Sequence, residues 1–139
     1  MGLDISHDCF SGAYSAFFRF REYVAKAAGY SVWDVKTSHG LVPTIVLDWG
    51  HITEKNLAGK WEKTPDDPLI VLFAHYDDRG CIYPEQALPL SNSLQELLPF
   101  LTGSGGGHLE SAGGVRQVAI NFIKGLRTAA LSGEPVTFG

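Results

Sequence analysis

The sequence predicts an α+β fold: a single compact domain over residues 1–139, in which a small, mostly antiparallel sheet packs against about three helices. Apolar residues recur at helical spacing in three segments, and short β-branched or apolar runs lie between the first and second of them. With 139 residues, 45% of them hydrophobic and 19% charged, the chain has the composition of one globular domain that buries its own core.

The first predicted helix covers residues 13–28. Its apolar face carries Tyr14, Phe17, Phe18, Val24, Ala25 and Ala28. Asp8 or Ser11 would cap its start, and Gly29 would end it. The cations among these aromatic residues are expected to form a solvated flank whose long stems cover apolar surface; they are Arg19, Arg21 and Lys26.

Strands are predicted next, over residues 31–36, 42–48 and 69–74. The last of these is a continuous apolar run that suits a central strand. Pro43 indicates that its strand begins there or lies at a sheet edge. Residues 51–67 are polar and are expected to form a long excursion, anchored by Trp49 and Trp61.

A second helix is predicted to begin at Pro84, because proline suits a first helical position. Its buried stripe consists of leucines: Leu90, Leu94, Leu97, Leu98 and Leu101. A glycine-rich loop over residues 102–107 follows, and then a last helix over residues 112–130. Residues 135–138 are predicted to form a short strand that closes the sheet.

Composition excludes several classes of function. The net charge is −4 and the eleven Lys and Arg residues are scattered, which disfavours duplex nucleic acid as a partner. The longest apolar run, residues 69–74, is too short to span a membrane. Two cysteines without a secretory signal are typical of a reducing cytoplasm.

Three separated segments combine a histidine with carboxylates or glycines near the expected ends of regular elements. They contribute His7 and Asp8; His75, Asp77 and Asp78; and His108 after three glycines. Convergence of the three histidines would create a site able to hold a divalent metal or perform acid–base chemistry. Each segment also has a simpler explanation: a helix cap at Asp8, a polar turn after residue 74, and a flexible glycine linker before His108.

These same segments carry a resemblance to a family of small uncharacterised phage and prophage proteins. The carriers are residues 2–17, residues 75–80 and residues 106–108, and the resemblance extends over most of the chain. Arg79 departs from the family pattern, which has an acid immediately before the loop glycine. The resemblance implies a viral product acting in the cytoplasm of a bacterial host, and it supplies no catalytic residues.

The leading hypothesis is an anti-defence protein that binds and sequesters a nucleotide-like host immune signal, with a homo-oligomer as the expected assembly. Tyr14 and Phe18 would stack on the ligand, and Arg19 and Arg116 would bind its phosphates. This hypothesis requires no cofactor. One alternative is a metal-dependent hydrolase that degrades such a signal, and this alternative requires a divalent metal. Another alternative is an inhibitor of a host defence protein.

Overall fold

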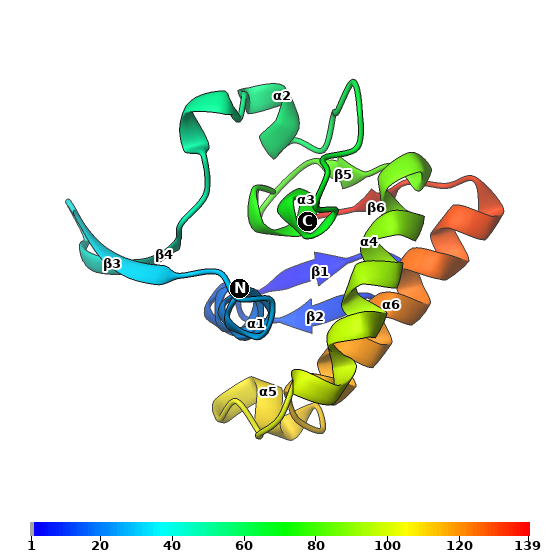
Figure 1. The fold of residues 1–139 in the computed structure, drawn as a ribbon. Helices are drawn as coiled ribbons and strands as arrows, with labels where there is room; N and C mark the ends of the chain where they lie inside the picture. Colours follow the sequence, from blue (N-terminus) through cyan, green and yellow to red (C-terminus); the bar gives the residue numbers. More distant parts are fainter. Residues whose placement is uncertain (1) are drawn as a thin grey trace.

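The computed structural model describes residues 2–139 and confirms the α+β fold (Figure 1). The helices are α1 (Tyr14–Ala27), α2 (Glu54–Leu57), α3 (Leu69–Phe73), α4 (Pro84–Leu97), α5 (Gly107–Ser111) and α6 (Val115–Ser132). The strands are β1 (Leu3–Ile5), β2 (Phe10–Gly12), β3 (Val32–Thr37), β4 (Gly40–Ile45), β5 (Cys81–Ile82) and β6 (Val136–Thr137). Short 3-10 turns occupy Trp49–His51 and Leu98–Phe100.

The three long helices confirm the helical periodicity of the sequence. Helices α4 and α6 lie side by side, and α1 packs against both (Figure 1). Their apolar faces meet in a core built around Phe17, Phe20 and Phe122, whose neighbouring rings have centroids 5.8–6.5 Å apart. Burial of such rings is the main source of stability, at about 25 cal/mol per Å² of apolar surface removed from water.

Three two-stranded antiparallel sheets replace the expected single sheet, and two of them are joined. The β1–β2 hairpin, which the sequence did not predict, contacts the β5–β6 pair through an isolated bridge between Ile5 and Phe138. The Ser6 amide donates to the Thr137 carbonyl at 2.9 Å, and the Gly139 amide donates to the Asp4 carbonyl at 3.1 Å. The chain ends of the described region therefore lie against each other.

The prediction of a central strand over residues 69–74 is wrong, because this segment forms α3. A short run that is apolar on every side has no periodicity to separate a buried strand from a buried helical turn. Asp67 and Pro68 select the helix. The Asp67 carboxylate accepts from the Leu69 amide at 3.1 Å, and proline is compatible with a helix start.

The β3–β4 hairpin confirms the two strands predicted near residues 31–36 and 42–48, with β4 displaced toward the turn. It extends away from the helical body in Figure 1. Ile45 at the end of β4 is buried, whereas most of β3 is exposed. The hairpin is therefore anchored at its base.

The excursion over residues 51–67 contains α2 and docks on the loop that follows α3. The Tyr76 amide donates to the Leu57 carbonyl at 2.8 Å, and the Cys81 amide donates to the Ala58 carbonyl at 3.1 Å. Gly59 permits this approach: it has a φ of +95°, and a Cβ there would lie 1.6 Å from the Cys81 carbonyl oxygen. Glycine at this position sets how closely the two loops pack.

Candidate functional site

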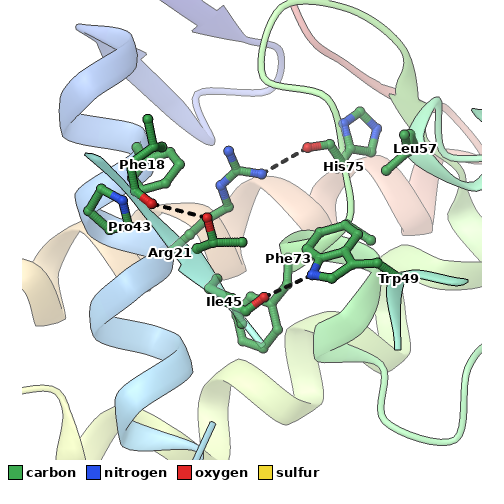
Figure 2. Close-up of a pocket in the computed structure, with 11 residues that line it drawn as sticks. Phe18, Arg21, Pro43, Ile45, Trp49, Leu57, Phe73 and His75 are labelled. Carbon is green, nitrogen blue, oxygen red and sulfur yellow. Dashed lines mark hydrogen bonds between the residues drawn. The ribbon is translucent and has the colours of Figure 1, made fainter. Parts of the chain in front are cut away.

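A pocket of about 200 Å³ lies between the base of the hairpin and the helical body (Figure 2). Strand β4 contributes residues 42–45, α1 contributes Phe18 and Arg21, α3 and the turn after it contribute residues 73–75, and Trp49 and Leu57 complete the lining. We call it the hairpin pocket. Its surface is mainly apolar, with few polar groups, which is the usual character of a small-molecule site.

Arg21 is the cation of the hairpin pocket, and its burial corrects the prediction of a solvated flank. Its Nη1 donates to the carbonyls of His75 at 2.8 Å and Leu72 at 3.4 Å. Its Cζ lies 4.7 Å from the Phe17 ring centroid and 5.7 Å from that of Phe18, within cation–π range. Within residues 2–139 Arg21 forms no ion pair, and its Nε and Nη2 have no hydrogen-bond partner.

Burial lowers the pKa of Arg21 to about 10, and the nearby Asp77 carboxylate acts in the opposite direction. The guanidinium therefore stays charged at neutral pH. A buried cation ordinarily has a carboxylate or a dense set of acceptors around it. Arg21 contacts two backbone carbonyls and two aromatic rings, and the Asp77 carboxylate acts on it from beyond ion-pair distance, so no anion is in contact with its positive charge at the pocket.

His75 lies next to Arg21, and its ring is held on both sides. Nδ1 is 2.6 Å from the Tyr76 carbonyl, Nε2 is 2.9 Å from the Cys81 carbonyl, and the ring stacks on Phe138 with centroids 4.0 Å apart. Burial lowers the pKa of His75; the two carbonyls oppose this shift and Arg21 adds to it. Since both nitrogens face carbonyl oxygens, neither is presented to a metal.

Trp49 supplies the aromatic side chain on the hairpin side of the pocket. Its Nε1 donates to the Ile45 carbonyl at 3.0 Å, which fixes the indole beside the end of β4. Phe18 and Pro43 belong to the same lining, as Figure 2 shows. Trp49 is 40% exposed, so part of its surface is accessible from solvent.

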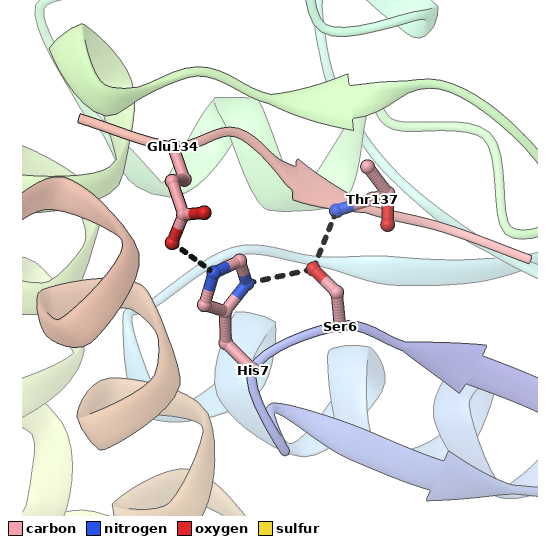
Figure 3. A network of polar contacts seen from close by, with 4 residues as sticks. All are labelled: Ser6, His7, Glu134 and Thr137. Atoms are coloured by element: carbon pink, nitrogen blue, oxygen red, sulfur yellow. Dashed lines mark hydrogen bonds and ion pairs between the residues drawn. The ribbon is translucent and has the colours of Figure 1, made fainter. Parts of the chain in front are cut away.

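His7 belongs to a separate network, at the turn between β1 and β2 (Figure 3). Its Nε2 is 3.2 Å from a Glu134 carboxylate oxygen, and its Nδ1 is 2.8 Å from the Ser6 hydroxyl. The Ser6 hydroxyl also accepts from the Thr137 amide at 2.8 Å. The network ties the turn to the segment before β6, so His7 has a structural role there.

His7 and Asp8 both adopt the left-handed conformation, with φ values of 60° and 58°. This tight turn packs on α6 at Gly125, where a Cβ would lie 2.4 Å from the Cys9 sulfur and 2.7 Å from the His7 carbonyl. The predicted capping of α1 by Asp8 or Ser11 is wrong, because Ala13 occupies the cap position and makes no side-chain bond. In the structure, the His7-Asp8 pair forms the backbone turn between β1 and β2.

Asp8 and His108 line a second, more polar groove together with Asp4 and Asn121. The Nε2 of His108 is 2.8 Å from the Ser11 carbonyl, so this histidine links α5 to β2. The approach again depends on glycine, since a Cβ at Gly12 would lie 2.3 Å from that nitrogen. The groove brings two of the predicted ligand-binding residues to one surface.

The remaining predicted residues are dispersed. Asp78 is exposed and lies 3.5 Å from Arg79, and Asp77 is half-buried. Tyr14 packs against the core, while Arg19 donates to the Gly105 carbonyl at 3.4 Å. Arg116 is exposed on α6. Of the predicted binding residues, only Phe18 and His75 line the hairpin pocket.

The structure therefore does not bring His7, His75 and His108 to one site. Each is engaged by different partners: Ser6 and Glu134, backbone carbonyls after α3, and the Ser11 carbonyl. Throughout residues 2–139, no group of three His, Cys, Asp or Glu side chains is arranged to hold a metal ion. His75 lines the hairpin pocket and His108 lines the second groove, and the three histidines share no hydrogen-bond partner among the described residues.

Sequence reasoning missed Arg21 and Trp49 as site residues. Charge alone suggests exposure for Arg21, but this residue lies three and four positions from Phe18 and Phe17 on one helical face. This spacing places Arg21 beside the two aromatic rings, and it is the sequence feature that could have predicted the burial of Arg21. The sequence indicates Trp49 only as an anchor of the excursion, because its place beside α1 depends on how the hairpin folds back.

Comparisons with protein-family models, with curated proteins and with solved structures found no match. None of the helices within residues 2–139 is both long and apolar enough to cross a lipid bilayer. The functional interpretation therefore depends on the geometry and charge of the hairpin pocket.

Proposed function

We propose that the protein binds a small nucleotide-like ligand in the hairpin pocket, with an anionic group at Arg21 and a planar ring beside Trp49. The observation that carries this proposal is the buried, charged guanidinium that has no ion pair within residues 2–139 and borders an apolar pocket. A phosphate or carboxylate of the ligand would supply the missing anion.

The free donors of Arg21 suit such an anion. Nη1 is fixed by the carbonyls of Leu72 and His75, so the guanidinium plane is held in place before a ligand arrives. Nε and Nη2 then offer two donors at the spacing that phosphate and carboxylate oxygens accept. A pre-fixed side chain loses little conformational entropy on binding, which favours affinity.

The aromatic lining suits the ring. Trp49 and Phe18 can stack on a planar heterocycle, and base–aromatic stacking contributes about 1–3 kcal/mol per base. The pocket volume of about 200 Å³ is below the range of about 300–1,000 Å³ typical of complete ligand sites. It therefore accommodates one ring or one phosphate-bearing portion, with the rest of the ligand at its mouth.

Capture is favoured over turnover by the chemistry of the lining. His75 is the general base that the pocket could offer, and both of its nitrogens are occupied by carbonyl oxygens. We propose reversible sequestration of a nucleotide-like host signal by a phage-encoded protein as the biological role. The hydrolase alternative lacks a corresponding arrangement of groups in the hairpin pocket.

Isothermal titration with three probes tests the assignment of ring and anion: adenosine 5′-monophosphate, adenosine, and ribose 5-phosphate. We expect the monophosphate to bind more tightly than either fragment. Arg21→Met should weaken monophosphate binding at least about tenfold through loss of charge-assisted hydrogen bonds, and should change adenosine binding little. Arg116→Met removes an exposed cation elsewhere and serves as the matched control.

Because Arg21 is buried, Trp49→Leu provides a second variant at a partly exposed position. It should weaken both adenosine and the monophosphate while leaving the far-ultraviolet circular dichroism unchanged. Binding of the monophosphate that is unaffected by either variant would rule out the hairpin pocket.

A second experiment separates capture from turnover. The monophosphate is incubated with excess protein, and the protein is then removed by heat denaturation. Intact recovery supports sequestration, because binding to the folded state is reversed on unfolding. New products that disappear in EDTA would instead support the hydrolase.

A further inference from the structure

We propose that strand β3 pairs with β3 of a second copy of the chain about a two-fold axis, which creates a four-stranded sheet from two hairpins. The proposal is independent of ligand binding in the hairpin pocket, since β4 and not β3 lines that pocket. It rests on the free edge of β3, the exposed apolar side chains of the hairpin, and the positions of Asp34 and Lys36.

The hairpin is an incomplete sheet. Two-stranded sheets are marginal by themselves in water, and stability ordinarily needs a third strand or a packed face. Most of β3 is solvent-exposed, including Trp33 at 66% and Val35 at 45%, and Leu41 of β4 is 69% exposed. A second hairpin would bury part of this apolar surface and extend the sheet.

The backbone of β3 shows which groups are free. The Val46 amide donates to the Ser31 carbonyl, which makes Ser31 and Val46 a hydrogen-bonded pair in the register that places Trp33 opposite Thr44. Hydrogen-bonded and non-hydrogen-bonded pairs alternate in antiparallel sheets. The amide and carbonyl groups of Val32, Asp34 and Lys36 therefore point to the open edge of β3.

The two edges of the hairpin differ in their capacity to pair. On β4, Pro43 lies opposite Asp34, at a non-hydrogen-bonded position, so its missing N–H falls on the outer edge of β4. Proline at such a position is a common protection against edge pairing. Strand β3 contains no proline within Val32–Thr37, so its edge is the one open to a partner.

The charges of β3 select one self-pairing register. When Val35 faces Val35 of the second copy, Asp34 lies opposite Lys36 and Lys36 lies opposite Asp34, which gives two ion pairs across the axis. Trp33 then lies diagonal to the second Val35, on the same face. A shift that places Asp34 opposite itself would juxtapose like charges, which is unfavourable between directly opposed strand residues.

A charge-exchange experiment tests both the pairing and its register. Sedimentation equilibrium measures the dimer dissociation constant of the wild type and of Asp34→Lys, Lys36→Asp and the double variant. Each single variant places like charges opposite each other twice and should weaken the dimer about tenfold or more. The double variant restores both ion pairs and should return the constant to within about threefold of wild type.

Mixing the two single variants provides a stronger test. Asp34→Lys carries two lysines on the edge and Lys36→Asp carries two aspartates, so a heterodimer regains both ion pairs that each homodimer lacks. Lys26→Asp makes the same change of charge at an exposed position of α1 and should leave association unchanged. A monomeric wild type at millimolar concentration, or single variants that dimerise like the wild type, would overturn the proposal.

Discussion

The Nη1 of Arg21 donates to the main-chain carbonyl of His75 at 2.8 Å, across 54 positions of sequence. This contact joins the first helix to the turn after α3 and positions both residues at the hairpin pocket. A guanidinium that is fixed by the backbone is oriented by the fold itself. The hairpin pocket therefore takes its shape only when the turn after α3 packs against α1.

Replacement of Gly59 by alanine should strongly destabilise the protein. The glycine has a φ of +95°, and a Cβ would lie 1.6 Å from the Cys81 carbonyl oxygen, so backbone segments must separate to admit it. We expect a loss of about 3 kcal/mol or more in the free energy of unfolding, measured by urea denaturation. Gly29→Ala is the matched control, because Gly29 has a φ of +89° and no atom lies within 4 Å of the place where its Cβ would stand. That control should cost only about 1–2 kcal/mol for the left-handed conformation, and equal losses would contradict the proposed contact.

The stability of the protein should fall as the pH decreases below about 6.5, the ordinary pKa of a histidine. Burial lowers the pKa of His75 in the folded state, so the unfolded chain binds this proton more readily. The contribution of neutral His75 to the free energy of unfolding is complete above the unfolded pKa of about 6.5. It is lost progressively as the pH falls from there toward the folded pKa. Urea denaturation at a series of pH values below neutrality measures the slope, and the comparison is with His75→Gln. A slope that persists unchanged in His75→Gln would assign it to other groups; His39→Gln, at an exposed position, should behave as wild type.

Cys9 should be unreactive in the folded protein. Burial and the neighbouring Asp8 carboxylate raise the pKa of its thiol to about 12, and the thiolate is the reactive species. In a Cys81→Ser background, labelling by iodoacetamide in mildly alkaline buffer should proceed only as fast as the protein opens, and should become rapid in urea. Comparable rates in the folded and denatured protein would contradict the burial of Cys9.

In the network around His7, Ser6 should contribute more than Glu134 to the free energy of unfolding. Ser6→Ala removes the acceptor of the Thr137 amide and a partner of the His7 ring, and should cost about 1–2 kcal/mol in the free energy of unfolding. Glu134→Gln alters an exposed contact between the Glu134 carboxylate and the His7 ring, and even a full ion pair at such a position contributes only about 0–1 kcal/mol. Thermal denaturation of both variants gives the order, and a larger loss for Glu134→Gln would reverse this interpretation.

Helical periodicity made α1, α4 and α6 predictable from the sequence, because the buried face of each repeats every three or four residues. Strand β1 was not predictable in the same way. It has three residues, and its alternation of Leu3, Asp4 and Ile5 is too short to separate from chance. One of its contacts lies in the tail, so part of the information that stabilises it is not local.

The candidate site was less predictable than the fold. The three segments that each contain one histidine predicted a site because imidazole can bind metals and transfer protons. In the structure, His7 and His108 instead make close contacts that glycines at positions 125 and 12 permit. The sequence predicted a solvated position for Arg21, because a single sequence does not show which groups surround a cation. Uncompensated charge is a property of three-dimensional surroundings, and it emerges only when α1, α3 and the hairpin are assembled.

The pairing of β1 with the tail has a consequence for synthesis on the ribosome. Strand β1 emerges long before Phe138, which bridges Ile5 and stacks on His75. Closing a loop of that length must precede the gain from these contacts, which slows folding. The bridge between Ile5 and Phe138 therefore forms only after residue 138 has left the exit tunnel, and until then β1 has β2 as its strand partner.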